Sequence, residues 1–582
     1  MRNIILVIAL AAVVYFAGNA SVGLWDRDEP RYAQCSRQML QSGDWVVPRL
    51  YDEIRANKPP LIYWCQATAM RLLGDAPING TFAARLPSAT AMLLTLAILA
   101  IAISRHVGKE QAFWTVLVMS SSLMTIVAAK VALTDSVLLV FGTIAQLCLY
   151  TIWRGSRSWK PAMLLAIALG LGAMTKPLVL LTVGATGFVL LVFKAIKEIR
   201  KQTTPRGFAV VGVEDTGSPG ALPDIAPSRS ISISVAQVLV GIFIIAIIVA
   251  PWLYLVHHRA PEFLGKATAE AKAHLESGKE GHRFPPGYHL LLIWVTFFPW
   301  CLLLPMAIGM GIRYRATPQI RFALAAAIGP WLVLEFFGTK LPHYILAAFP
   351  ALSYLAASAI IRSLRGEDRD MESRPFLIGA GCWAFFAALV GLLPWLLVPG
   401  FRLPGIHAPS FPGQPTAIIA TFTLATIAFG GAVFLFLKMY RLTAAMLTLG
   451  GGMMAICLIV YVLYLPRAQF LRVSIHVAQV LQRVGATHEG DAVMIDYKEP
   501  SLGFYQGGTI REEKRSFLLP LHWNRWPRWM TVTREALDGA PPESRARLRI
   551  VADPENPSRG LAYSDGGRVV ELIVVERVAG GK

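Results

Sequence analysis

Charged residues are scarce in this sequence. Of its 582 residues, 16% are charged and 55% are hydrophobic, whereas about 25% of the residues in soluble globular proteins are charged. This composition excludes a soluble single-core enzyme, a disordered chain and a nucleic-acid-binding protein. The six cysteines are scattered, with no CxxC pair and no Cys/His cluster, so they predict neither a disulfide framework nor a zinc site. The composition predicts a polytopic α-helical membrane protein.

Long apolar runs account for the low charge. A transmembrane helix needs about 20 mostly apolar residues, and reading for such runs gives 13 candidates: roughly 3–20, 82–104, 111–129, 133–152, 161–173, 177–194, 232–256, 289–310, 322–337, 343–362, 376–397, 415–437 and 442–464. The fifth and sixth are short pieces separated by Thr175-Lys176-Pro177. The first run has features of a signal peptide, but an uncleaved anchor is favoured, and either choice leaves loop 21–81 on the same side.

The net charge of +19 is distributed unevenly among the loops. One alternate set of loops is basic: 105–109, 154–160, 194–206, 313–321, 362–374 and 438–441. The positive-inside rule makes these loops cytoplasmic. In the opposite set, loop 21–81 has seven positive and seven negative residues. Much of the excess charge is therefore topological, and 13 spans from a cytoplasmic N-terminus place the tail after about 466 outside.

Two regions are predicted along the chain. Residues 1–466 form the transmembrane region, which includes external loops at 21–81 and 257–288. Its segment 202–231 is rich in Pro, Gly, Ser and Thr and is predicted to be a flexible cytoplasmic linker. Residues 467–582 change to short strand-like runs, such as 492–495 and 569–575, among charged residues, which predicts a small external α/β domain.

Loop 21–81 holds the first candidate site residues. Asp28-Glu29-Pro30 resembles a helix start, with acids near the N-cap and proline at the first helical position. In a helix over 31–40, Tyr32, Cys35, Met39 and Leu40 fall near one face, as expected for a helix in the membrane interface. On spacing alone, Asp28 is equally a helix cap or a functional carboxylate.

Further charges stand at the external ends of other spans. Ionisable groups at membrane depth are costly and are usually functional or paired. Each one alone has a simpler explanation, and Lys58 in the Asn57-Lys58-Pro59-Pro60 turn is more often an interfacial snorkelling lysine. Five such residues stand at the external ends of spans: Asp28, Lys58, Asp135, Lys176 and Lys340. Together they predict an outward-facing cavity suited to a phosphate-bearing lipid.

Loop 257–288 mixes acids, lysines and histidines. A solvated amphipathic helix is the default interpretation of this pattern. Its first part, His257-His258-Arg259, is the part expected near the cavity. The acids and histidines lack the close spacing of metal ligands, so no metal site is predicted from the residues.

These stretches carry a family resemblance. Residues 25–64, with DEPRYA, SRQML, SGDWVVP and NKPPLIYW, resemble the first external loop of the bacterial C-type (GT-C) glycosyltransferases. This group includes the lipid A 4-amino-4-deoxy-L-arabinose transferases (glycosyltransferase family 83) and their protein O-mannosyltransferase relatives. The similarity continues in order through LTD (133–135), MTK (174–176), APW (250–252), FPW (298–300), KLPHYIL (340–346) and EPSLGFY (499–505).

The resemblance implies a GT-C fold of 13 spans and an inverting sugar transfer from a polyprenyl-phosphate donor. It implies a lipid A or lipopolysaccharide acceptor at the periplasmic face of the bacterial inner membrane. The implied residues are catalytic Asp28 and Asp135, donor-phosphate ligands Lys58, Lys176 and Arg259, and cavity residues Glu29, Arg31, Tyr32, Asn57, Lys340 and Tyr344.

One residue departs from the family pattern. The aminoarabinose transferases usually have Glu-Lys-Pro where this chain has Asn57-Lys58-Pro59. That glutamate is associated in the family with a metal and with the sugar end of the cavity. Its loss puts a divalent metal and an aminoarabinose donor in doubt and leaves a neutral or acidic sugar open. No cofactor is therefore predicted.

Other functions remain open at this point. A protein O-glycosyl (mannosyl-type) transferase would use the same class of donor. A transporter of lipid-linked sugars would show paired repeats and broken helices near the bilayer midplane, whereas the charges here gather toward one face. An O-antigen ligase or polymerase also acts on lipid-linked glycans, but the DEP and NKPP motifs argue against it.

Overall fold

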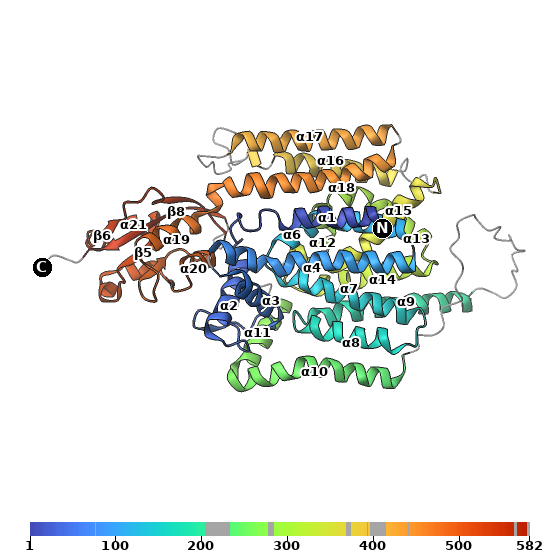
Figure 1. The fold of residues 1–582 in the computed structure, drawn as a ribbon, viewed down its shortest axis with the longest axis horizontal. Helices are drawn as coiled ribbons and strands as arrows, with labels where there is room; N and C mark the ends of the chain where they lie inside the picture. The colour runs from blue at the N-terminus through green and yellow to red at the C-terminus, as the bar shows by residue number, and fades with distance from the viewer. Residues whose placement is uncertain are drawn as a thin grey trace, which may run out of the picture.

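The computed structural model describes the chain except for residues 76, 204–232, 277–283, 368–373, 393, 396–414, 440, 564–566 and 579–582. Nearly all of the predicted linker 202–231, part of loop 257–288 and the end of the predicted span 376–397 lie outside the described residues. In the described part, long helices lie side by side in a bundle, and an α/β domain projects from one end of it (Figure 1).

The first part of the bundle contains α1 (Arg2–Phe16), α2 (Asp28–Ser42), β1 (Arg49–Leu50), β2 (Glu53–Ile54), α3 (Leu61–Leu73), α4 (Pro77–His106), α5 (Lys109–Ser120), α6 (Leu123–Lys130), α7 (Thr134–Trp153), α8 (Trp159–Ala173) and α9 (Leu178–Thr203). The second part contains α10 (Val235–Arg259), α11 (Glu262–Glu276), α12 (Tyr288–Thr296), η2 (Trp300–Leu303), α13 (Leu304–Arg313), α14 (Pro318–Phe336), η3 (Pro342–Ala348), α15 (Phe349–Leu364), α16 (Arg374–Leu392), α17 (Thr416–Lys438) and α18 (Leu442–Leu458), which continues through the π-helical η6 (Ile459–Tyr464) and η7 (Leu465–Arg467).

Each of the 13 predicted spans coincides with a helix or a bent pair of helices. Within the described residues, eight helices are long and apolar enough to cross a membrane, and two bent pairs raise this number to ten. The other three, α1, α8 and the apolar part of α16, are shorter apolar helices. The structure thus confirms a polytopic helical membrane protein, while the count of 13 crossings stays a prediction.

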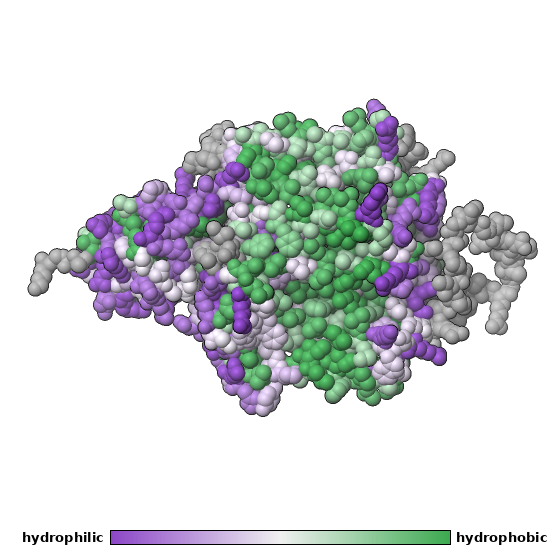
Figure 2. Space-filling view, in the orientation of Figure 1, coloured by the Kyte–Doolittle hydropathy of each residue, from purple (hydrophilic) through white to green (hydrophobic). Residues whose placement is uncertain are grey.

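The surface of the bundle matches this interpretation. Figure 2 shows a broad apolar belt around the helices, with polar residues on the α/β domain at one end and at the opposite end of the bundle. Exposed apolar side chains are common on α10, including Leu239, Ile242, Phe243 and Ile247. The core of a bilayer contains no water that could hydrogen-bond to exposed polar groups, so an apolar outer surface is the stable arrangement there.

The two bent pairs follow from local sequence. Ser121 and Ser122 separate α5, which ends at Ser120, from α6, and the two helices are inclined by 64°. Pro299 separates α12 from η2 and α13, which are inclined by 119°. Serine side chains compete for backbone hydrogen bonds and proline lacks an N–H, so both favour a break in a helix.

The C-terminal domain contains η8 (Gln469–Leu471), α19 (Val473–Arg483), β3 (Ala492–Ile495), α20 (Pro500–Gln506), β4 (Arg511–Glu513), η9 (Arg515–Leu518), η10 (Pro520–Arg525), β5 (Trp529–Thr533), α21 (Arg534–Asp538), α22 (Pro542–Arg545), β6 (Leu548–Ile550), β7 (Ser558–Ala562) and β8 (Arg568–Arg577). Its sheet has the order β4-β3-β5-β8-β6, with β7 also paired to β8. Strand β3 is parallel to β4 and β5, and β8 is antiparallel to its neighbours. The predicted strands 492–495 and 569–575 coincide with β3 and β8, so the predicted α/β character is confirmed.

The first loop packs inside the protein. Helix α2 begins at Asp28, two residues before the predicted start at Pro30. Its Tyr32, Cys35 and Met39 pack against Ile62 and Tyr63 of α3, whereas Leu40 packs against a different cluster that includes residues of the C-terminal domain. Its opposite side contacts α20 of the C-terminal domain. The interfacial placement of this helix was therefore wrong in one respect, because its apolar face is covered by protein rather than by lipid.

Candidate active site

A polar cavity lies where loop 21–81, the α6–α7 junction, the α8–α9 junction and η3 meet. Its volume is about 430 Å³, which is within the range of roughly 300–1,000 Å³ typical of small-molecule sites. Eight of the eleven predicted site residues line it: Asp28, Arg31, Tyr32, Asn57, Lys58, Asp135, Lys176 and Tyr344. Residues separated by more than 300 positions in the chain are thus brought together.

Asp28 lies at the first position of α2 and at the wall of the cavity. Its carboxylate is 4.0 Å from Arg31 Nη1, one turn further along the same helix, and the side chain is 49% exposed. A carboxylate at a helix N-terminus is stabilised by the helix dipole. The N-cap residue of α2 is Arg27 and no side chain makes a cap hydrogen bond, so the cap that spacing suggests is not formed by Asp28, and its carboxylate is open to a ligand.

Asp135, at the start of α7, is engaged by several partners. Lys176 Nζ lies 3.2 Å from its Oδ1, His343 Nε2 lies 3.5 Å from its Oδ2, and the Thr134 hydroxyl donates to Oδ2 at 3.1 Å. The Lys176 ammonium also stands 3.9 Å from the centre of the Tyr344 ring. This cluster fixes the ammonium of Lys176 at the cavity wall by an ion pair and a cation–π contact.

Lys58 adds a second ammonium to the same cavity. Its Nζ donates to the backbone carbonyl of Asn57 at 3.1 Å. Burial, and then the nearby charge of Lys176, lower the pKa of Lys58 to about 8, against the opposing effect of Asp28. Two ammonium groups that repel each other in this way would both be stabilised by a bound dianion or monoanion such as a phosphate.

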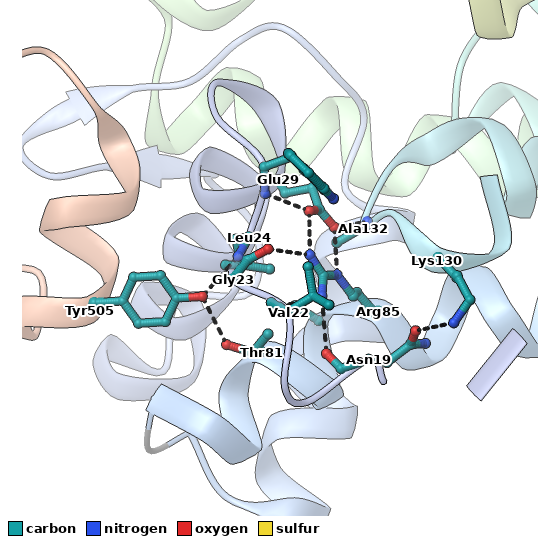
Figure 3. Close-up of polar contacts among 12 residues, drawn as sticks. Asn19, Val22, Gly23, Leu24, Glu29, Thr81, Arg85, Lys130, Ala132 and Tyr505 are labelled. Atoms are coloured by element: carbon teal, nitrogen blue, oxygen red, sulfur yellow. Dashed lines mark hydrogen bonds and ion pairs between the residues drawn. The ribbon is translucent and has the colours of Figure 1, made fainter. Parts of the chain in front are cut away.

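Glu29 is placed differently from its neighbour Asp28. It is 1% exposed and lies behind the cavity, where its carboxylate forms a bidentate pair with Arg85 of α4, with Nε–Oε1 at 2.9 Å and Nη2–Oε2 at 2.7 Å (Figure 3). It also accepts from the backbone N–H groups of Trp25 and Ala132. The prediction that Glu29 lines the substrate cavity is corrected by this geometry, because all of its contacts are structural.

Arg85 completes this network. It donates to the carbonyls of Asn19, Val22 and Gly23, at 2.7 to 3.0 Å. The pair therefore joins α2, α4, the α6–α7 junction and the segment that links α1 to α2 (Figure 3). It fixes the chain that leads into Asp28.

We expect Glu29→Gln and Arg85→Met each to destabilise the protein by about 3–5 kcal/mol, because each leaves one charge buried without its partner. Thermal unfolding of the purified protein in detergent, followed by intrinsic tryptophan fluorescence, measures this loss. Arg71→Ala, at an exposed position of α3, is the control and should unfold at the wild-type temperature. If both variants unfolded at the wild-type temperature, the structural role of the Glu29–Arg85 pair would be contradicted.

Two other predicted residues also lie outside the cavity. Lys340 is 2% exposed and donates to the carbonyls of Glu335 and Phe337, both at 2.7 Å, at the end of α14. Arg259 is 54% exposed and pairs with Asp44 at 3.1 Å. The structure therefore places Lys340 as a cap of α14 and Arg259 on the surface, and neither is among the residues that line the cavity.

The cavity also contains residues that the sequence interpretation missed: Asp26, Arg27, Arg55, Thr134, Glu270, Thr339, His343 and Tyr563. His343 stands beside the predicted Tyr344, so a signal was available for it. Arg55, two residues before the NKPP motif, lies 5.4 Å from the Tyr32 ring. Glu270 and Tyr563 come from α11 and from the C-terminal domain, and nothing in their local sequence points to the cavity.

The C-terminal domain holds the chain that leads into α2. Ser501 donates to Asp26 through its backbone N–H at 2.9 Å and through its hydroxyl at 2.5 Å. Tyr505 Oη accepts from the backbone N–H of Leu24 at 2.8 Å, and the ring of Tyr563 packs edge-on against Trp25. Burial, and then the neighbouring Glu499, raise the pKa of Asp26. Asp26 therefore serves as a contact between the two regions.

Close packing explains the glycine of the EPSLGFY motif. A Cβ at Gly503 would overlap the hydroxyl of Tyr51 from the first loop. In the same helix, the Phe504 carbonyl accepts from Arg37 Nη1 at 2.7 Å, and the Arg37 guanidinium stacks 3.9 Å from the Phe504 ring centre. The motif thus docks the C-terminal domain on α2.

The residues present do not fit a metal site of protein ligands. Within the part of the chain that the structure describes, no group of three or more His, Cys, Asp and Glu side chains is placed to hold a metal ion. Asn57 stands where the family usually has glutamate, and Asp135 is already engaged by Lys176 and His343. No step of the reaction is therefore assigned to a metal.

An apolar cavity adjoins the polar one. It is lined mainly by α4, α7, α9, α14 and α15, and it extends from Asp135, His343 and Tyr344 to His106 and Gln319 at the far end of the bundle. These first three residues line both cavities. A charged pocket thus continues directly into an apolar one between the helices.

Comparisons with known proteins identify several relatives. The dolichyl-phosphate-mannose-protein mannosyltransferase family matches residues 1–260. The undecaprenyl phosphate-alpha-4-amino-4-deoxy-L-arabinose arabinosyl transferase of Edwardsiella ictaluri is 28% identical over 433 residues, covering 72% of this chain and 68% of that protein. The protein of the same name from Yersinia enterocolitica is 27% identical over 428 residues, with the same coverage of each chain. The structure is similar to that of ArnT from Cupriavidus metallidurans bound to undecaprenyl phosphate, with a TM-score of 0.70, 20% identity and 99% of each chain covered.

The fold, the polar cavity and these relatives define a class. The protein is a multi-pass membrane protein with the fold of these glycosyltransferases. Within that class it resembles the lipid A 4-amino-4-deoxy-L-arabinose transferases.

Proposed function

We propose that this protein transfers a sugar from a polyprenyl-phosphate donor to lipid A or lipopolysaccharide, with inversion at the anomeric carbon, at the periplasmic face of the bacterial inner membrane. The observation that carries the proposal is the junction of the two cavities at Asp135, His343 and Tyr344. A ligand with an anionic head and a long apolar tail fits a cationic pocket that continues between membrane helices. The named activity of the relatives supports this choice.

Lys58 and Lys176 are proposed to bind the donor phosphate. Their ammonium groups would form charge-assisted hydrogen bonds to its oxygens. During transfer, the bond from the anomeric carbon to the phosphate oxygen breaks, and the electron pair leaves with the polyprenyl phosphate. Positive groups held at that place stabilise the negative charge that grows on the leaving group.

Asp28 is proposed to act on the acceptor. Of the two predicted catalytic carboxylates, Asp135 is held by Lys176, His343 and Thr134, whereas Asp28 remains 49% exposed at the cavity wall. If the acceptor group is a hydroxyl, Asp28 takes its proton as the oxygen attacks the anomeric carbon. If the acceptor group is an ionised lipid A phosphate, Asp28 orients that phosphate. With either acceptor, Asp135 fixes the position of Lys176.

The proposed orientation has the C-terminal domain and the polar cavity in the periplasm. The C-terminal domain lies at one end of the bundle together with α2 and α11, which contribute residues to the cavity, whereas the N-terminus lies near the other end (Figure 1). The basic loops 105–109, 154–160 and 313–321 join helices at that other end. Nucleotide-sugars are made in the cytoplasm, so a periplasmic site requires a donor already carried across the membrane on a lipid.

Reporter fusions test this orientation. An alkaline phosphatase, which requires the periplasm for activity, should be active when fused after Lys582 and inactive when fused within 205–225. A β-galactosidase at the same two positions is the control and should show the opposite pattern. The reverse result for both reporters would contradict the proposed orientation.

A second candidate function is protein O-glycosylation with the same donor. The match of the protein mannosyltransferase family to residues 1–260 specifically favours it. Mass spectra of lipid A and of periplasmic proteins, from cells with and without the gene, separate the two. A sugar mass lost from lipid A supports the first proposal. A sugar mass lost only from proteins supports the second and contradicts the first.

A further inference from the structure

Helix α11 places a third carboxylate at the polar cavity, beside Asn57. The Asn57 side-chain amide donates from Nδ2 to Glu270 Oε1 at 2.9 Å, and both residues line the cavity. The two are separated by 213 positions in the chain. Position 57 itself has an amide, yet the fold brings a carboxylate from another segment to the same place.

Asn57 lies between this carboxylate and the cationic part of the cavity. Its backbone carbonyl accepts from the Lys58 ammonium at 3.1 Å, while its side-chain amide donates to Glu270. A ligand whose phosphate contacts Lys58 would therefore have its next group close to Glu270.

The support of α11 fits a role at a binding site. Its residue Phe263 packs with Trp252 and Val256 of α10 and with Val47 and Ala56 of the first loop. The Trp252 indole N–H donates to the carbonyl of Val46 at 3.0 Å. These contacts attach the start of α11 to the loop that contains Asn57, and so they position Glu270 over the cavity.

We propose that Glu270 is a specificity residue that contacts the sugar of the donor. This inference rests on the proposed function. With the phosphate bound by the lysines, the sugar lies next along the ligand, where Glu270 accepts hydrogen bonds from its donors. A basic amino group on the sugar forms a charge-assisted bond there, a hydroxyl forms a weaker one, and an acidic group is repelled. The absence of a glutamate at position 57 therefore does not exclude an amino-sugar.

The experiment compares two polyprenyl-phosphate donors, one with 4-amino-4-deoxy-L-arabinose and one with L-arabinose. The purified full-length protein should use the amino-sugar donor with the higher kcat/KM. Glu270→Gln should reduce the ratio of the two kcat/KM values by about 10-fold or more, because a neutral amide replaces the charged acceptor. A ratio of two activities is not changed by a loss of folded protein.

A double variant provides the stricter test. The double variant Asn57→Glu with Glu270→Gln exchanges the amide and the carboxylate between the two positions. The contact again contains one carboxylate, so the preference for the amino-sugar should be restored. Glu262→Gln, at an exposed position of the same helix, should keep the wild-type ratio.

Three results would overturn the inference: a wild-type protein without preference between the donors, a wild-type ratio in Glu270→Gln, or a double variant with the ratio of Glu270→Gln. A wild-type protein that uses neither donor would instead contradict the proposed function itself. The two failures are therefore distinguishable.

Discussion

Replacing Asp28 by Asn should reduce sugar transfer by at least about 100-fold while the protein remains folded and inserted, because a positioned general base contributes roughly 10²–10⁴ to a rate. The side chain faces the cavity and is 49% exposed. Asparagine is also a good residue at a helix N-terminus, so α2 should keep its start. The measurement is turnover in membranes, normalised to the amount of inserted protein.

A matched control is available in the same loop. Asp52 is 81% exposed and pairs only at the surface, with Arg511 at 3.3 Å. Asp52→Asn should retain wild-type turnover, because exposed ion pairs contribute little. Wild-type turnover in Asp28→Asn would remove this carboxylate from the mechanism.

The second large effect is expected at the two lysines. Lys58→Ala and Lys176→Ala should each weaken donor binding by about 1.5–3 kcal/mol, which is the value of a hydrogen bond to a charged group. Lys176→Ala should have the larger effect, because it also leaves Asp135 without its ion-pair partner. Steady-state KM and kcat for the polyprenyl-phosphate donor measure both losses, and Lys266→Ala, at an exposed position of α11, is the control. An unchanged KM and kcat in both alanine variants would exclude Lys58 and Lys176 as phosphate ligands.

Donor binding should also depend on pH in a particular direction. The pKa of Lys58 is lowered to about 8, first by burial and then by the charge of Lys176. The phosphate binds the protonated ammonium. Donor affinity should therefore be highest below pH 8, where Lys58 is protonated, and should fall as the pH rises through this value. Because arginine stays protonated throughout this range, Lys58→Arg should bind less tightly at pH 7 but lose the decline above pH 8. If the donor affinity of Lys58→Arg fell by the same amount above pH 8, the pH dependence would have to come from another group.

Much of the architecture could be predicted because its signals are local. Apolar runs of about 20 residues indicate membrane helices wherever they occur. The acid-acid-proline start of α2 and the continuous apolar strand β3 are likewise signals carried by neighbouring residues. The charges at the external ends of the spans then predicted which junctions meet, and eight of the eleven predicted site residues do line one cavity.

Side-chain direction could not be predicted in the same way. Asp28 and Glu29 are adjacent acids, but successive residues of a helix point about 100° apart. One therefore faces the cavity, while the other pairs with Arg85 behind it. Lys340 resembles a ligand in the sequence, yet its ammonium is satisfied by carbonyls at the end of α14. Such outcomes depend on which partner the folded chain brings near.

Contacts between distant segments were the other missing part. Glu270 reaches Asn57 from α11, and Tyr563 reaches the cavity from the C-terminal domain. Neither residue is part of a motif, and the acids of α11 alternate with lysines as they would on a solvated helix. Only the packing of α11 against the first loop distinguishes Glu270 from the other acids of its helix.

The most direct test of sugar transfer from a lipid-linked donor uses the purified full-length protein in proteoliposomes. Polyprenyl phosphate carrying a radiolabelled sugar is supplied together with lipid A, and the label and the freed polyprenyl phosphate are both measured. We expect label on lipid A and one polyprenyl phosphate released for each sugar transferred, with no transfer from the soluble nucleotide-sugar. Transfer from the nucleotide-sugar without the lipid carrier would contradict the proposed donor, and movement of the intact donor across the membrane without its cleavage would identify a transporter instead.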